Sequence, residues 1–212
     1  MTLASLLPVA LASPLLPSED KPVYWLLAGD LKTAPKGGWG DGFLATTVAT
    51  RSSGHNYGHS GAITASFRAG SNWGKATKHM QTYKDRYRVY VTIQFVHNDQ
   101  KDTSGVSLDQ YKAKLKSFAD EAKTAVAEPV LLTPVTRREL FREQSRYVNA
   151  IGKAAASKYN LVENDWMHLD EWGGVFFARI VTDLLVEKYR ELQQFTTDNS
   201  TLSALIKQGK PA

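Results

Sequence analysis

Hydrophobic residues occur along this chain in short continuous runs separated by longer segments with helical periodicity. The run Val23–Gly29 has the unbroken apolar character of a strand buried on both faces. Residues 87–95 are rich in β-branched and aromatic side chains, and residues 129–135 repeat the buried pattern. Residues 43–50 are also rich in strand-forming residues. These four segments are therefore predicted to be strands.

Helical periodicity is clearest in residues 107–125, where Ser107 is the predicted N-cap. The apolar face of this helix comprises Leu108, Tyr111, Leu115, Phe118 and Ala122. Residues 173–189 are apolar enough to pack as a helix on a sheet, and residues 136–165 read as helix almost throughout. Strands that alternate with helices predict a parallel sheet with right-handed crossovers in a three-layer, flavodoxin-like α/β domain.

The 212 residues suit one domain, which we place at residues 21–192, with a polar and frayed tail at residues 193–212. Residues 1–20 contain an apolar core and an Ala10-Leu11-Ala12 pattern that favours a signal peptide and secretion. A disordered N-terminal tail on a cytoplasmic protein is the alternative. No other run approaches the ~20 apolar residues that span a bilayer, so no membrane partner is expected.

Composition narrows the possible partners. The net charge is +5, but Lys and Arg are mixed with acidic residues as on solvated helix faces, so nucleic acid is not expected as a partner. The absence of cysteine excludes disulfides and thiolate metal sites. His55 and His59 have a helical metal-pair spacing, but Asn56, Tyr57 and Gly58 between them argue against a helix. We therefore expect a monomer without metal or cofactor.

Unusual residues follow the predicted strands, where a parallel sheet places its ligands. Four blocks occur in order: GDLKTAPKGGWGDGF, NYGHSGAITASFRAG, IQFVHNDQ and NDWMHLDEWGG. Together they resemble the four sequence blocks of the SGNH hydrolases, also called GDSL esterases, over residues 23–189. The combination of Gly-Asp-x-x-x-Ala, Phe-x-His-Asn-Asp and Asp-x-x-His is most similar to the fungal branch near rhamnogalacturonan acetylesterases.

The resemblance implies ester hydrolysis, with an acetylated polysaccharide or a small ester as substrate. It assigns the backbone N–H of Gly61 and the side chain of Asn98 as oxyanion donors, each worth about 3 to 4 kcal/mol in such sites. It assigns Asp165 as the acid that orients the general base His168.

The sequence lacks the nucleophile that the resemblance implies, because Leu31 occupies the position at which the family has serine. Loss of that group costs about 10⁶ in turnover, or roughly 8 kcal/mol of barrier. We therefore expect serine-esterase activity to be greatly reduced or absent. The alternatives are a non-catalytic glycan-binding or decoy pseudoenzyme, and a cleft redirected to non-hydrolytic chemistry on a small molecule.

Two further departures affect the expected scaffold. Val96 occupies a position that usually carries glycine, so the loop that holds Asn98 is expected to be displaced. The helical pattern of residues 136–165 leaves no room for the fifth strand that the family would have, and the last edge strand is expected to be missing.

Several side chains near these blocks are predicted to contact substrate: Asp30, His97, Trp39, Tyr57, Trp73 and Trp166. The aromatic rings can stack on sugars, although a place in the core is the alternative for each. For Asp30 the alternative is a carboxylate that caps backbone N–H groups of the Gly-rich loop. For His97 it is a structural role.

Overall fold

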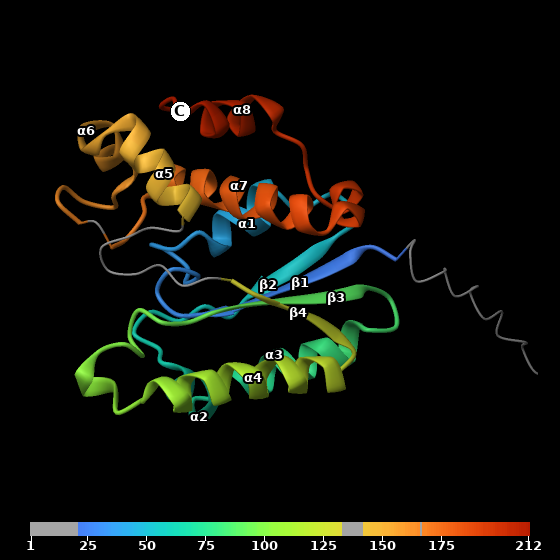
Figure 1. Cartoon of the computed structure of the whole chain (residues 1–212). Coiled ribbons are helices and arrows are strands. Elements are labelled where there is room, and N and C mark those ends of the chain that lie inside the picture. The colour runs from blue at the N-terminus through green and yellow to red at the C-terminus, as the bar shows by residue number, and fades with distance from the viewer. Residues whose placement is uncertain (1–20, 133–141, 166) are drawn as a thin grey trace, which may run out of the picture.

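A parallel β-sheet forms the centre of the molecule. The computed structural model describes residues 21–132, 142–165 and 167–212. Within them the sheet has four strands in the order β2-β1-β3-β4 (Figure 1). The strands are β1 (Val23–Gly29), β2 (Ser53–Asn56), β3 (Arg88–Gln94) and β4 (Ala127–Leu131). The central pair β1 and β3 is in register from Val23 opposite Arg88 to Gly29 opposite Gln94, so both strands end at the same edge.

Helices cover both faces of the sheet (Figure 1). The helices on one face are α2 (Thr64–Ala69), α3 (Asn72–Tyr83) and α4 (Leu108–Thr124). The helices on the other side are α1 (Gly40–Thr46), α7 (Glu171–Lys188), α5 (Arg142–Ile151), α6 (Lys153–Ala156) and α8 (Ser200–Gln208). Short 3₁₀ turns lie at η2 (Asp102–Ser104), η3 (Ser157–Tyr159) and η4 (Arg190–Phe195). The predicted three-layer α/β fold is confirmed.

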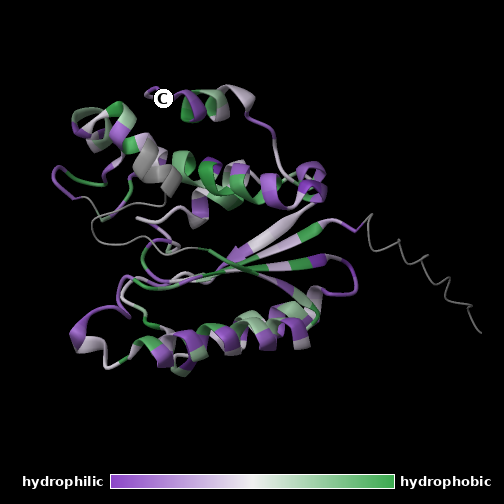
Figure 2. Cartoon of the chain, viewed as in Figure 1, coloured by the Kyte–Doolittle hydropathy of each residue, from purple (hydrophilic) through white to green (hydrophobic). Residues whose placement is uncertain are grey.

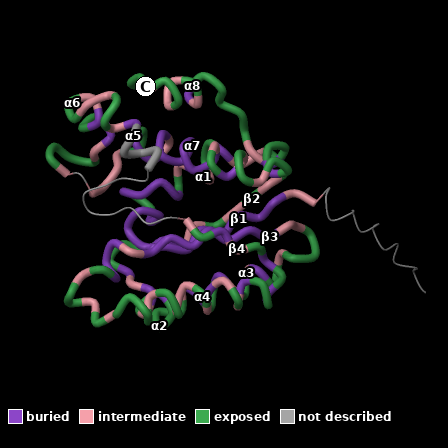
Figure 3. Tube along the Cα trace, viewed as in Figure 1, coloured by how far each residue is buried: buried purple, intermediate pink, exposed green. Residues whose placement is uncertain are grey.

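Strand β1 is apolar along its whole length because helices cover both of its faces. Its side chains point to opposite faces in turn, and Trp25 lies in the hydrophobic cluster beneath α7 whereas Leu26 lies in the cluster beneath α3 and α4. Both faces are covered, so every residue of β1 is buried. Figure 3 shows this buried centre between largely exposed outer helices, and α4 alternates hydrophobic and hydrophilic residues in Figure 2.

The predictions for β1, β3 and the helices α4 and α7 are confirmed, whereas residues 43–50 were wrongly assigned to a strand. Phe43 belongs to α1, where its ring contacts that of Trp25 at a centroid distance of 5.1 Å. Tertiary packing of this ring overrides the strand propensity of the threonines that follow. The actual second strand, Ser53–Asn56, is short and polar, so it carries no hydrophobic pattern that could predict it.

Other predicted boundaries also differ from those in the structure. Strand β4 begins at Ala127 and ends at Leu131, and residues 133–135 of the predicted strand lie outside the described residues. Leu108 opens α4 but is 65% exposed, so it is not part of the apolar face. The chain beyond Gln193 is not frayed, since Asn199 caps α8 and Leu202 is buried in the core.

The described part of residues 136–165, which starts at residue 142, contains α5, α6, η3 and a single β-bridge between Asn160 and Leu169. Over the described residues the sheet therefore ends at β4. None of the helices in these ranges has the length and apolar character needed to cross a bilayer. The proposed signal segment, residues 1–20, lies outside them, and the division into leader, domain and tail stays a prediction.

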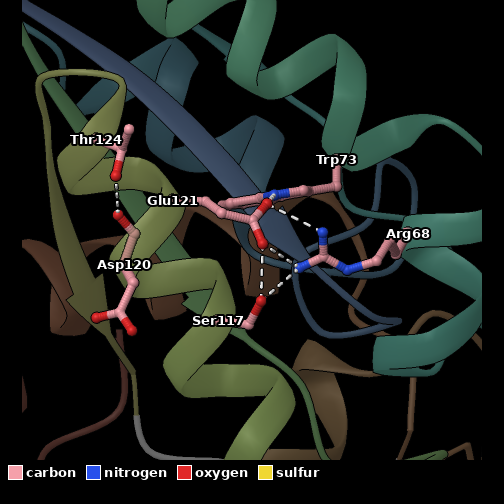
Figure 4. A network of polar contacts seen from close by, with 6 residues as sticks. All are labelled: Arg68, Trp73, Ser117, Asp120, Glu121 and Thr124. Carbon is pink, nitrogen blue, oxygen red and sulfur yellow. Dashed lines mark hydrogen bonds and ion pairs between the residues drawn. The ribbon is translucent and has the colours of Figure 1, made fainter.

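A polar network joins the three helices of one layer (Figure 4). The carboxylate of Glu121 in α4 accepts two hydrogen bonds from Arg68 at 2.9 Å each, one from Trp73 Nε1 at 2.6 Å and one from Ser117 at 2.7 Å. Trp73 is buried and tied to this network, so its predicted contact with substrate is wrong. Burial acts to raise the pKa of Glu121, but these hydrogen bonds outweigh it and lower the pKa to about 2.

We expect Glu121→Gln to lower the free energy of unfolding by about 1 kcal/mol near pH 6, a value discounted because the side chain is 39% exposed. A carboxyl whose pKa falls on folding stabilises the protein above its unfolded pKa, and this contribution is lost as pH falls toward 2. Urea unfolding at several pH values measures the difference in the free energy of unfolding, the gap between variant and parent. The exposed Glu187→Gln is the matched control, and a gap that stays constant down to pH 2 would contradict the prediction.

Candidate functional site

The loops that carry the predicted site lie at one edge of the sheet. Parallel strands place the segments that follow β1, β2 and β3 together at their carboxyl ends. The segment before α7 joins them, because Leu169 N donates to Gly37 O at 2.9 Å. Residues far apart in the sequence thus meet at this edge.

Asp30 ties the first loop to the loop after β3. Its Oδ1 accepts from Lys32 N at 3.1 Å, and its Oδ2 accepts from Val96 N at 3.1 Å and His97 N at 3.0 Å. Burial raises the pKa of this carboxyl, although the three N–H groups and the Lys32 ammonium act in the opposite direction. Asp30 is 1% exposed, so the contacts match the capping alternative and not a direct contact with substrate.

Asp165 and His168 are held together as the resemblance implies. Asp165 Oδ2 lies 2.8 Å from His168 Nδ1, and Oδ1 accepts from the backbone N–H groups of Met167 and His168. Burial acts to raise the pKa of Asp165, but these hydrogen bonds outweigh it and lower the pKa. A carboxylate at Nδ1 favours a proton there and leaves Nε2 as the basic nitrogen. The pair can therefore accept a proton from a reacting group.

The imidazole of His168 rests on the Gly-rich loop. Gly37 has a φ of 135°, and a Cβ added there would lie 3.0 Å from His168 Cδ2. Glycine is thus required both by the backbone conformation and by the ring that packs on it. Lys32 Nζ donates to Met167 O at 2.7 Å, which joins the same two loops a second time.

The two predicted oxyanion donors lie on adjoining loops. Gly61 is exposed and has a φ of 82°, a conformation that favours glycine although nothing crowds the position. Asn98 is buried, and its Nδ2 donates to Ala62 O at 3.1 Å while its Oδ1 accepts from Lys101 Nζ. A primary amide has a second N–H, which can serve a ligand. The contact with Ala62 joins the Asn98 side chain to the loop that contains Gly61.

Leu31 lies between Asp30 and Lys32 in this tied loop and is 6% exposed. Its isobutyl group has neither a proton to give nor a lone pair to attack with. The hydrogen bonds of the described residues include none between His168 and a serine, threonine or tyrosine hydroxyl.

Valine at position 96 fits its loop without backbone strain. Val96 is not among the residues with positive φ, and its N–H donates to Asp30. The expected displacement of the loop that holds Asn98 therefore finds no support in backbone strain at Val96.

Trp39, one of the aromatic residues predicted to contact substrate, belongs to the core instead of the site. Trp39 is 2% exposed, and its Nε1 donates to Gln94 Oε1 at 2.8 Å, so the prediction that it contacts substrate is wrong. Tyr57 is half-buried, and its hydroxyl lies 3.1 Å from Nδ1 of His79 in α3. His97 is buried beside Asp30. Trp166 lies outside the described residues.

Sequence reasoning missed residues that hold these loops in place. Lys32 joins two loops, and Gln94 Oε1 accepts from both Thr33 Oγ1 and Trp39 Nε1. The sequence carries no signal that distinguishes Lys32 from Lys36 in the same loop. Across the described ranges, no group of three His, Cys, Asp or Glu side chains is placed to hold a metal ion.

Comparison with known proteins supports the resemblance. No protein-family model matches the chain. Rhamnogalacturonan acetylesterase RhgT of Bacillus subtilis (strain 168) is 34% identical over 143 residues, which cover 63% of this chain and 57% of RhgT. The chain therefore spans little more than half the length of this curated relative.

Solved structures share the fold. A variant of Axe2, an acetyl xylan esterase from Geobacillus stearothermophilus, has a TM-score of 0.55 at 18% identity, covering 83% of this chain and 96% of that one. The lipase/acylhydrolase from Enterococcus faecalis has a TM-score of 0.50 at 16% identity, with 78% and 96% covered. These structures show that the α/β fold is shared, and RhgT adds a likeness in sequence.

We expect Asp30→Asn to lower the free energy of unfolding by about 2 kcal/mol, because the amide NH₂ would face backbone N–H groups that the carboxylate now satisfies. Chemical denaturation of the variant and the parent measures the difference. The exposed Asp85→Asn serves as control. A variant as stable as the parent would show that these N–H groups do not depend on Asp30.

Proposed function

We propose that this chain is an SGNH/GDSL-type ester hydrolase scaffold of carbohydrate acetylesterase ancestry in which serine-dependent turnover is greatly reduced or absent. One observation carries the proposal: the Asp165–His168 pair is assembled, with Asp165 Oδ2 2.8 Å from His168 Nδ1. By the resemblance, Leu31 stands at the position from which a hydroxyl would attack.

The acetylesterase class rests on the similarity to RhgT, whose name describes a rhamnogalacturonan acetylesterase. The fold shared with Axe2, named as an acetyl xylan esterase, is consistent with that class. The proposed substrate is an acetylated polysaccharide or a small ester. The relation to the fungal branch, secretion and a monomeric state stay predictions.

In the proposed ancestral reaction, a hydroxyl at position 31 attacks the acyl carbon and gives its proton to His168 Nε2. Asp165 stabilises the imidazolium that forms. The Gly61 N–H and the Asn98 amide donate to the oxyanion, and their loops adjoin through the contact between Asn98 and Ala62. With Leu31 in place no covalent intermediate can form, and the lost step corresponds to about 10⁶ in turnover. What remains is a water activated by His168.

The leading alternative is a protein that binds a glycan without cleaving it. The same observation favours it, since the donors and the imidazole persist while the attacking group is gone. A cleft used for non-hydrolytic chemistry on a small molecule is a further possibility without a feature that selects its substrate.

We expect Leu31→Ser to raise the hydrolysis of p-nitrophenyl acetate by about 10³-fold or more, because the base and the oxyanion donors are already placed. Spectrophotometric release of nitrophenol measures the gain. Leu31→Ala separates the effect of a hydroxyl from the effect of removing bulk, and Leu31→Ser combined with His168→Ala should lose the gain. Parent turnover comparable with that of intact esterases, and abolished by His168→Ala, would overturn the proposal.

If the alternative holds, the parent protein should bind acetylated pectic oligosaccharides saturably in a calorimetric titration without releasing acetate. Gly61→Val should weaken binding, because its side chain adds bulk in front of the donor and its backbone is disfavoured at a φ of 82°. Acetate release that tracks binding would favour residual hydrolysis instead.

A further inference from the structure

We propose that Lys32 is a positioning residue that sets the distance between position 31 and the imidazole of His168. This inference rests on the proposed function, because it concerns how that site is held. Lys32 follows position 31 directly, and its side chain ends on the peptide that precedes His168. Its role would be to act through His168 and not on the substrate itself.

The contact itself is short and shielded from solvent. Lys32 Nζ donates to Met167 O at 2.7 Å, and the residue is 9% exposed. Burial of an ammonium is costly unless acceptors and opposite charges surround it. Burial lowers the pKa of Lys32, while the charges of Asp30 and Asp165 act in the opposite direction. Carboxylates from two different loops thus favour the charged form of this side chain.

The Met167 peptide is held from both sides. Its N–H donates to Asp165 Oδ1 at 2.9 Å, and its carbonyl accepts from Lys32. The next residue is His168, whose Nδ1 is bound to the other oxygen of Asp165. The turn that carries the imidazole is therefore closed locally by Asp165, and Lys32 ties it to the loop of position 31.

The other connections between these loops leave this distance less restrained. Leu169 N binds Gly37 O, and the ring of His168 packs on Gly37. Gly37 is six residues from position 31, so these two contacts act on position 31 only through the intervening turn. Lys32 is adjacent to position 31, so its side chain is the shorter connection. A shift of about 1 Å in such a site can cost as much as 10²-fold in rate.

The first test needs no catalytic activity. Lys32→Met keeps the length of the alkyl stem but removes the donor, and Lys36→Met makes the same change at an exposed lysine of the same loop. We expect the ring resonances of His168 in NMR spectra to shift or broaden in Lys32→Met and to stay unchanged in Lys36→Met. Unchanged His168 resonances in a folded Lys32→Met protein would overturn the proposal.

A rescue experiment covers the case in which Lys32→Met fails to fold. The chain has no cysteine, so Lys32→Cys introduces a single thiol. Alkylation of the unfolded chain with 2-bromoethylamine, followed by refolding, restores an ammonium on a lysine-length stem, whereas iodoacetamide gives a neutral side chain. The aminoethylated protein should recover the parent His168 resonances and the amidated protein should not. Equal spectra for the two products would argue against the proposed role.

A kinetic test separates this inference from the proposed function. In the Leu31→Ser background, Lys32→Met should lower kcat for p-nitrophenyl acetate about 10- to 100-fold with KM changed less than about two-fold. Lys36→Met should leave both parameters unchanged. If Leu31→Ser shows no gain while the His168 resonances respond to Lys32, the esterase proposal fails and the positioning role stands. If activity appears but is insensitive to Lys32, the positioning role fails.

Discussion

The candidate site depends on one buried carboxylate, that of Asp30. It accepts hydrogen bonds from the backbone at Lys32, Val96 and His97, and so joins the loop after β1 to the loop after β3. Both loops begin at the same edge because β1 and β3 run parallel and end in register. The sheet brings the segments near one another, and the hydrogen bonds of the carboxylate restrain their backbones. Without this anion, three backbone N–H groups would lose their acceptor.

The sequence predicted the parts of the fold whose pattern is determined by burial. β1 and β3 lie between two helical layers, so their apolar runs are unbroken and easy to recognise. β2 was missed because an edge strand of four polar residues needs no hydrophobic pattern, only backbone pairing with β1. The helix α1 was misread since its threonines favour strands, whereas the burial of Phe43 against Trp25 decides its structure. Local propensity failed where contacts distant in sequence dominate.

For the site, motif resemblance placed Asp165 and His168 in contact but could not tell which neighbours are structural. Trp39 and His97 belong to the motifs, yet both are buried. The Nε1 of Trp39 donates a hydrogen bond to Gln94 Oε1. Conversely, Lys32 has no place in the resemblance, and its role emerges from a contact across 135 positions of the chain. A single sequence cannot show such pairs, because the partner is a backbone carbonyl and carries no residue identity. Backbone acceptors and donors make up most of the ties that hold these loops.

This dependence on backbone contacts explains how the scaffold can persist with Leu31. Neither the ties of Asp30 and Lys32 nor the packing of Gly37 on His168 involves the side chain at position 31. A serine there would add a polar group at a position that is 6% exposed, whereas leucine buries apolar surface worth about 1.5 to 3 kcal/mol. Active-site residues often lower stability in exchange for function. Under the proposed function, stability favours a hydrocarbon at this position, and the other contacts of the site can persist because they also hold the loops of the fold.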